Sequence, residues 1–212
     1  MIIVGVTGGI AGGKSTVTRM LANLGAEVRS ADEDARAVLA DGSPALAAVL
    51  AAFPEARAED GALSRALLAR RIFADPGARA RLEAILHPAI IARMTGAITA
   101  ARSADPGVLA YETPLLYEAR LEALFDAVIA VLATPELQRE RLQARERAAN
   151  RNPLTEDELS ARLGAQIPPE EKARRADFVI RTDGTLADTE AQVRRVWERL
   201  GASGAAGHSS QA

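Results

Sequence analysis

The sequence has no cysteine, few aromatic residues and no block of basic charge. Cysteine is absent from all 212 residues, and aromatic side chains make up 3% of them. The lack of cysteine excludes disulfides, thiolate metal sites and a cysteine nucleophile. With 26 basic and 28 acidic residues, the formal net charge is −2. Nucleic-acid binding through a charged face is therefore not expected.

Leader and membrane signals are also missing. The N-terminal apolar run is short and lacks a basic region before it. No stretch approaches the roughly 18 apolar residues that a spanning helix needs. We therefore expect a cytoplasmic protein that acts without a membrane, as a monomer or weak homo-oligomer.

Short apolar runs alternate with helical patterns along the chain. The expected strands are 2–6, 26–30, 108–111, 127–133 and 178–181. The expected helices are 14–24, 34–53 with a break at 41–44, 63–73, 78–99 with a new start at Pro88, 135–149, 155–166 and 185–200. This alternation predicts an α/β fold, a five-stranded parallel sheet between two layers of helices. One domain is expected over 1–200, and 201–212, rich in Gly, Ala and Ser, is expected to be disordered.

A phosphate-binding motif follows the first expected strand. The segment from Gly8 to Thr16 fits G-x-x-x-x-G-K-[ST]. Glycines let the backbone wrap a triphosphate, and the helix after them directs its positive dipole end toward the anion. The motif predicts that Lys14 reaches the β- and γ-phosphates and that Ser15 binds Mg²⁺. The predicted ATP-binding residues are Gly9, Ile10, Ala11, Gly12, Gly13, Lys14, Ser15 and Thr16. The alternative is a glycine-rich turn with an incidental lysine.

Other classes of P-loop protein fit less well. The chain has no Asn-Lys pair of the kind that reads guanine, and no segment resembling L-S-G-G-Q. Its length is too small for a motor or helicase core. A small-molecule kinase remains, and such an enzyme needs an acid at the acceptor, an acid at the metal and mobile arginines.

The sequence offers candidates for these parts, each with an alternative. Asp32 follows the second strand, so it is a candidate base for an acceptor hydroxyl and equally a candidate helix-capping carboxylate, and neither role excludes the other. Glu112 ends the third strand, where it either holds Mg²⁺ through water or is merely solvated. Arg141 and Arg145 share a helix face and predict a lid over the transferring phosphate. The alternative is a solvated face that pairs with nearby glutamates. His87, a lone histidine, is more often structural than catalytic.

Together these segments resemble the dephospho-CoA kinase family over residues 2–200. The matching segments are Val6–Ile10, Ala31-Asp32, Ala35-Arg36, Asp60-Gly61, Arg65, Ile72-Phe73, Leu86–Pro88, Pro114–Glu118, Gln138, Arg141, Arg145, Gln166 and Ala176–Ile180. The resemblance implies ATP as donor, Mg²⁺, and the ribose 3′-hydroxyl of dephospho-CoA as acceptor. It also implies a helical CoA-binding subdomain over 60–105 and a lid over 138–170.

The resemblance assigns roles to several residues. Asp32 matches the proposed base, and Lys14, Arg141 and Arg145 complete the implied catalytic set. The implied acceptor-binding residues are Asp32, Arg36, Arg65, His87, Leu115 and Glu118. Ser15 and Glu112 form the predicted metal site, which comes from the motif and the strand end rather than from the resemblance.

The chain departs from the family pattern at three places. Ala11 stands where glycine is usual, which matters if its φ is positive. Ser30 replaces an aspartate, which leaves one acid fewer near the metal. The segment Arg181–Gly184 replaces Asp-Asn-x-Gly, so base contacts cannot be carried over there. Two alternatives to this function stay open: a kinase for another small acceptor such as a nucleoside, and a nucleotide sensor without turnover.

Overall fold

The computed structural model describes residues 1–103 and 107–207, although not the side chains of 73 and 202–207. These residues divide into two compact units. The sheet unit joins Met1–Ser30 to the residues from Ile98 onward, and the helical unit is Ala31–Ala97. Each unit is considered by itself below.

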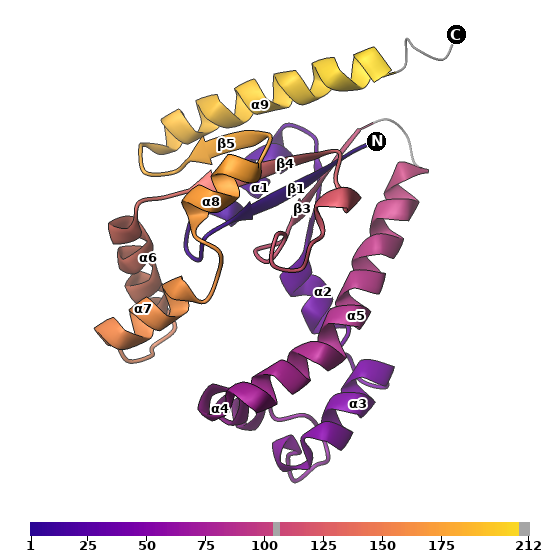
Figure 1. The fold of residues 1–212 in the computed structure, drawn as a ribbon, viewed down its shortest axis with the longest axis vertical. Helices are drawn as coiled ribbons and strands as arrows, with labels where there is room; N and C mark the ends of the chain where they lie inside the picture. Colours follow the sequence, from indigo (N-terminus) through magenta and orange to yellow (C-terminus); the bar gives the residue numbers. More distant parts are fainter. Residues whose placement is uncertain (104–106, 208–212) are drawn as a thin grey trace. The chain divides into compact units, whose positions relative to one another are not determined.

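A parallel sheet forms the centre of the sheet unit (Figure 1). Its strands are β1 Ile2–Gly8, β2 Glu27–Ser30, β3 Val108–Glu112, β4 Ala127–Leu132 and β5 Phe178–Arg181. They lie in the order β2-β3-β1-β4-β5, and every neighbouring pair is parallel. The predicted five-stranded parallel sheet is confirmed, and β1, which leads into the phosphate-binding motif, lies at its centre.

Side chains that alternate along the strands separate the two faces of the sheet. On one face Val4, Val6, Ile129 and Val131 join a core with residues of α1 (Lys14–Asn23) and α9 (Leu186–Gly207). On the other face the carbonyl of Pro114 accepts hydrogen bonds from Thr7 of β1 and from a lysine of α8 (Pro169–Arg175). Because strand side chains alternate with a period of two, helices α1 and α9 cover one face, and α8 and the segment after β3 cover the other.

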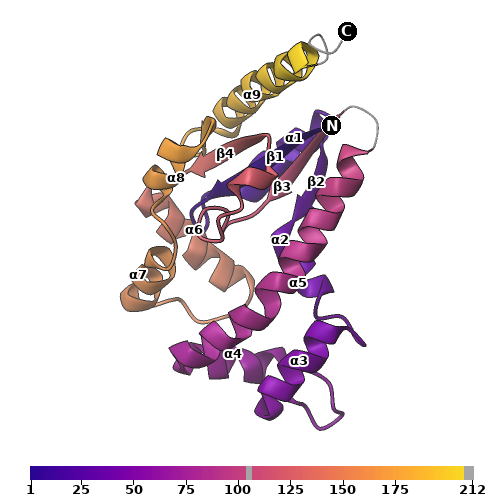
Figure 2. The ribbon, with the colours of Figure 1, turned by 45° about the vertical axis from the view of Figure 1, so that its right-hand side comes forward.

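Two further helices complete the sheet unit, α6 (Pro135–Ala148) and α7 (Glu156–Gly164). Figures 1 and 2 both show them side by side, within the span predicted as the lid. Helix α8 was not predicted, because its seven residues are mostly charged and show no apolar periodicity. Helix α9 runs to Gly207, so the predicted end at 200 is wrong. Alanine favours the extension of a helix that packing has already formed. The rest of the tail expected to be disordered, 208–212, lies outside the described residues.

The helical unit contains α2 (Ala31–Ala37), α3 (Pro44–Ala52), α4 (Arg65–Ala74) and most of α5 (Pro76–Arg102), which continues into the sheet unit. Its core is a separate apolar cluster that includes Val49, Phe53, Leu68 and Leu82. The unit therefore begins before the subdomain expected at 60–105, because α3 supplies core side chains to it.

Proline 88 lies inside α5 and does not begin a new helix, which corrects the prediction of a break there. An internal proline loses one backbone hydrogen bond. The helix has apolar residues on both sides of it, and packing of Leu82 and Met94 on either side favours continuation.

By length and composition, α5 is the one helix in the described part of the chain that would suffice to cross a membrane. The expectation that no segment reaches that length therefore does not hold for α5. A core helix of a soluble protein meets the same two criteria, so they are weak evidence of a span.

Candidate active site

The loop between β1 and α1 has the backbone geometry that a phosphate-binding loop requires. Its φ angles are positive at Gly8 (145°), Ala11 (54°) and Gly13 (94°). Gly13 is the left-handed cap of α1, and a Cβ there would lie 2.9 Å from Oγ1 of Thr182. Glycine adopts this conformation without the strain that a side chain adds. The first turn of α1 carries no acidic residue, so its positive dipole end can attract an anion.

Ala11 is the point at which the loop carries strain. Alanine stands here in place of the usual glycine, and its φ is positive. An alanine in this left-handed conformation costs roughly 1 kcal/mol. The methyl group is buried in a cluster with Leu142, Leu154 and Leu159. Burial of one methyl contributes about 0.8 kcal/mol, which offsets most of the strain. Ala11 therefore fits this loop because α6 and α7 supply an apolar environment for it.

Lys14 lies folded back across the loop. Its Nζ donates to the carbonyl oxygens of Gly9 at 2.9 Å and Gly8 at 3.3 Å, and the residue is 7% exposed. An ammonium held by neutral carbonyls exchanges them readily for an anionic oxygen, because charge-assisted hydrogen bonds are stronger. The position suits the predicted role of Lys14 at the β- and γ-phosphates.

Ser15 and Glu112, the predicted metal residues, are linked through Thr18. The Thr18 hydroxyl donates its one proton either to Oε2 of Glu112 or to the carbonyl oxygen of Ser15, each 3.3 Å away. Ser15 is exposed at the start of α1, and Glu112 is half-buried at the end of β3. A hydroxyl and a carboxylate are the hard oxygen ligands that Mg²⁺ takes while it keeps several waters. These residues fit that ion, although the described residues contain no cluster of three or more His, Cys, Asp or Glu.

Arg141 is bound to the loop rather than extended toward solvent. Its guanidinium donates to Ala11 O at 3.3 Å, Thr182 Oγ1 at 2.9 Å and Thr182 O at 2.8 Å. Arg145, one turn further along α6, is exposed. The two arginines predicted as a pair therefore differ: Arg141 braces the P-loop, and Arg145 is the one whose side chain reaches solvent.

Thr182 was not predicted as a site residue. Its hydroxyl is buried, donates to Gly12 O at 2.8 Å, lies 3.2 Å from Leu132 O and accepts from Arg141. It thus connects the residue after β5 with the P-loop and α6. The segment that departs from the family pattern therefore contacts the loop itself. No local pattern identifies Thr182, because its partners lie far away in the sequence.

Helices α6 and α7 are held together by an ion cluster as well as by the apolar cluster. Glu146 of α6 is 5% exposed and accepts hydrogen bonds from Arg151 and from Arg162 of α7. The hydrogen bond from Arg151 is the main cause that lowers the pKa of Glu146. Arg139 pairs with Glu156 in the same way. The pair of Arg151 with Glu146 is one that the alternative of a salt-bridged surface expected. The pairs Arg162–Glu146 and Arg139–Glu156 instead link α6 to α7.

Four of the six residues predicted on the acceptor side belong to the helical unit: Asp32, Arg36, Arg65 and His87. All of them are exposed. Helix α2 begins at Ala31, so Asp32 lies in its first turn and does not cap it, which corrects the capping alternative. Asp32 and Arg36 are one turn apart on the same side of α2.

Asp34 was missed, and it is the buried acid of this segment. It is 6% exposed and accepts a hydrogen bond of 2.8 Å from Nε of Arg93 on α5. This ion pair fixes α2 against α5 within the helical unit. The run Asp32-Glu33-Asp34 gave no signal that the third acid would be buried.

Leu115 and Glu118 belong to the sheet unit. Leu115 is 37% exposed, whereas Glu118 accepts from Nζ of Lys172 at 2.8 Å and from the backbone N–H of Ile167 at 2.9 Å. Lys172 is fully buried, and this burial lowers the pKa of its amine while Glu118 opposes the shift. The sequence pointed to Glu118 but gave no signal for Lys172, because α8 was missed.

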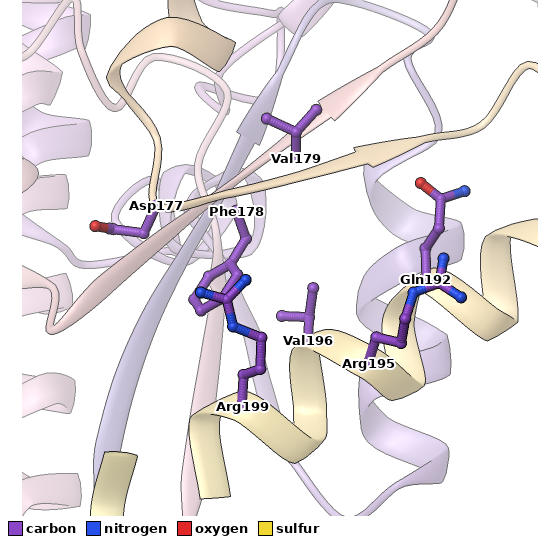
Figure 3. Close-up of a pocket in the computed structure, with 7 residues that line it drawn as sticks. All are labelled: Asp177, Phe178, Val179, Gln192, Arg195, Val196 and Arg199. Atoms are coloured by element: carbon purple, nitrogen blue, oxygen red, sulfur yellow. The ribbon is translucent and has the colours of Figure 1, made fainter. Parts of the chain in front are cut away.

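A cavity of about 280 Å³ lies between the start of β5 and α9 (Figure 3). It is lined by Asp177, Phe178, Val179, Gln192, Arg195, Val196 and Arg199. The guanidinium of Arg199 stacks 4.8 Å above the Phe178 ring, and the Gln192 amide bonds both backbone groups of Arg181. The P-loop follows the carboxyl end of β1, whereas this cavity lies at the opposite end of the parallel sheet. It is therefore separate from the candidate active site.

Comparisons with known proteins agree with these features. A family model described as dephospho-CoA kinase matches residues 2–188. The dephospho-CoA kinase of Anaeromyxobacter dehalogenans is 50% identical over 187 residues, covering 87% of this chain and 85% of that protein. The dephospho-CoA kinase of Syntrophotalea carbinolica is 41% identical over 201 residues, covering 94% and 92%. Among solved structures, a dephospho-CoA kinase from Campylobacter jejuni is similar with a TM-score of 0.63 and 27% identity, covering 93% of this chain and 96% of that one.

Proposed function

The chain belongs to the dephospho-CoA kinase family, and we propose that it transfers the γ-phosphate of ATP to the ribose 3′-hydroxyl of dephospho-CoA. The product is coenzyme A, so the reaction is the last step of coenzyme A biosynthesis. One observation within the molecule supports phosphate transfer most directly. The P-loop has left-handed turns at Ala11 and Gly13, and the ammonium of Lys14 lies over the carbonyls of Gly8 and Gly9.

On the donor side, the loop backbone and the start of α1 bind the phosphates of ATP, and Lys14 turns from the carbonyls to the β- and γ-phosphates. Ser15 and Glu112 hold Mg²⁺, which neutralises phosphate charge when it is bound. Arg141 keeps the loop in shape through Ala11 and Thr182. Arg145 neutralises charge on the transferring group when α6 and α7 cover it.

On the acceptor side, the helical unit binds dephospho-CoA. Asp32 orients the 3′-hydroxyl and takes its proton, and Arg36 lies one turn away on the same side of α2 to pair with an acceptor phosphate. Arg65 and His87, both exposed, are the further contacts proposed in this unit. Because the transition state of phosphoryl transfer is loose, positioning and charge neutralisation contribute more than proton abstraction.

The test is the conversion of dephospho-CoA to coenzyme A by the purified protein. The protein is mixed with Mg-ATP and dephospho-CoA, and the product is identified by mass and its phosphate position by ³¹P NMR. Lys14→Ala serves as the inactive control. A panel of nucleosides and nucleoside monophosphates is assayed in parallel. Turnover of another acceptor without any formation of coenzyme A would overturn the proposed acceptor, and ATP binding without turnover of any acceptor would favour a sensor.

We further propose that the enzyme acts in the cytoplasm as a monomer or weak homo-oligomer, without nucleic acid or membrane. Light scattering after size-exclusion chromatography over a range of protein concentrations tests the first point. A stable assembly at the lowest concentration would contradict it.

A further inference from the structure

Lys172 is a buried cation that the proposed reaction does not use. Its side chain is 0% exposed, and its Nζ donates to Glu118 Oε1 at 2.8 Å and to Pro114 O at 2.6 Å. A lysine is almost never fully buried unless it is paired, because the loss of hydration is costly. The chain therefore keeps this pair at a cost that an apolar pair of similar size would avoid.

Both acceptors of Lys172 also bind other parts of the chain. Pro114 O accepts from the hydroxyl of Thr7, the penultimate residue of β1, at 3.2 Å. Glu118 Oε1 accepts from the N–H of Ile167, which lies between α7 and α8. The network thus joins the strand that leads into the P-loop, the segment after β3, and the segment that returns from the lid.

The two ends of the lid segment meet at Gly9 of the P-loop. A Cβ built on Gly9 would lie 2.5 Å from Nε2 of Gln138, near the start of α6, and 2.8 Å from Cγ of Pro169, the first residue of α8. Gln138 is 4% exposed, and its Nε2 has no hydrogen-bond partner among the described residues. Gly9 is therefore enclosed by the two chain segments about which the lid would move.

We propose that Lys172 and Glu118 are positioning residues that hold the return segment of the lid, and with it Pro169, against Gly9. This proposal rests on the proposed function and deepens it. The pair fixes where the lid is hinged relative to the phosphate-binding loop, so that Arg145 of α6 reaches the transferring phosphate in the correct place. A misplacement of about 1 Å at a reacting group can reduce turnover by on the order of 100-fold.

The test separates positioning from stability by removing both charges together. Lys172→Met or Glu118→Gln alone leaves one buried charge without its partner, so each single variant is expected to unfold at lower urea concentration. The double variant has no buried charge, and stability is expected to return because neutral replacements for a buried ion pair are tolerated. The hydrogen bond from Lys172 to Pro114 O is still missing in the double variant, and only the weaker one from Thr7 remains.

The readouts are kcat with dephospho-CoA, and amide hydrogen exchange of residues 138–170 with and without ATP. In the double variant we expect kcat to fall about 10- to 100-fold while urea stability is regained. We also expect ATP to slow exchange in 138–170 of the wild type but not of the double variant. The KM for dephospho-CoA should stay within about twofold, whereas a direct contact between Glu118 and the acceptor would raise it.

The matched control is the ion pair of Arg175 with Glu122. Arg175 lies on the same short helix, is partly exposed and stacks on Tyr117, and its guanidinium donates to Glu122 rather than to Pro114. The double variant Arg175→Met/Glu122→Gln is expected to keep both kcat and the effect of ATP on exchange. Full kcat together with ATP-dependent protection in Lys172→Met/Glu118→Gln would overturn the proposal. If the wild type makes no coenzyme A, the proposed function fails, but the exchange experiment still decides the role of the pair because it needs ATP alone.

Discussion

Thr182→Val removes one hydroxyl and changes the side-chain shape little. In the wild type this hydroxyl donates to Gly12 O at 2.8 Å and accepts from Arg141 at 2.9 Å, and the residue is 5% exposed. Valine leaves the carbonyl of Gly12 and one N–H of Arg141 without that partner. The P-loop would then lose its link to the residue after β5.

The expected magnitude follows from the number of hydrogen bonds that are lost. A buried polar group left without a partner costs about 1–3 kcal/mol, so the free energy of unfolding should fall by about that amount. We expect about 1–2 kcal/mol of this to appear as a cost of ordering the loop around ATP. That corresponds to a 5- to 30-fold weaker affinity for ATP. Urea unfolding measures the first quantity, and titration calorimetry with a non-hydrolysable ATP analogue measures the second.

Thr189→Val is the matched control. Thr189 is also buried, and its hydroxyl donates to the carbonyl of Thr185 at 3.1 Å and lies 3.5 Å from that of Arg181, neither of which belongs to the P-loop. It should lower stability by about 1 kcal/mol and leave ATP affinity unchanged. An unchanged ATP affinity in Thr182→Val, or an equal loss in both variants, would refute the idea that Thr182 acts through the loop.

Three other outcomes follow from the site. Lys14→Ala and Arg145→Ala should each reduce kcat at least as much as Asp32→Ala, because charge neutralisation outweighs proton transfer; near-normal turnover in both basic variants would contradict this. Glu146 has a lowered pKa in the fold, so it contributes stability above its unfolded pKa of about 4.3, and this contribution is lost as the pH falls through its lower folded pKa. Glu146→Gln should therefore reduce the slope of the unfolding free energy against pH in that acidic window, as measured by urea titrations at several pH values. An unchanged slope would show that Glu146 does not contribute to the pH dependence of stability. Ala11→Gly should change the unfolding free energy by less than about 1 kcal/mol, as measured by urea unfolding. Relief of the strain at positive φ stabilises the variant, whereas the loss of a buried methyl and the greater freedom of its unfolded chain destabilise it. A loss of stability above about 2 kcal/mol would show that the strain is not relieved.

The P-loop and the strand before it could be predicted because their signals are local. A β-branched run, glycines at fixed spacing and a lysine at the start of a helix lie within 16 residues of the N-terminus. The same holds for β1, β3, β4 and β5, whose apolar runs are bounded by polar residues, whereas β2 has a single apolar residue, Val28. Helix α8 could not be predicted, because Lys172 is buried only through partners that lie more than 50 residues earlier in the chain.

The two arginines of α6 show which features could not be predicted from local sequence spacing. Spacing placed Arg141 and Arg145 on one helix face, which is correct, but it gave them one role. In the structure Arg141 binds Ala11 and Thr182, and Arg145 is exposed. Helical periodicity determines direction around an axis, whereas the contact that a side chain makes depends on which other segment packs there.

The sequence by itself determined the reaction class, since a phosphate cradle is made by consecutive backbone groups and needs no distant partner. It also determined the parallel sheet, through the alternation of strands and helices. Only the tertiary structure decided that Ala11 is strained yet packed against the apolar cluster of α6 and α7. The same is true of the hydroxyl of Thr182 closing onto Gly12, and of the buried Lys172–Glu118 pair beside Gly9. These features depend on burial and on hydrogen bonds between segments far apart in the chain, and both arise only when the chain has packed.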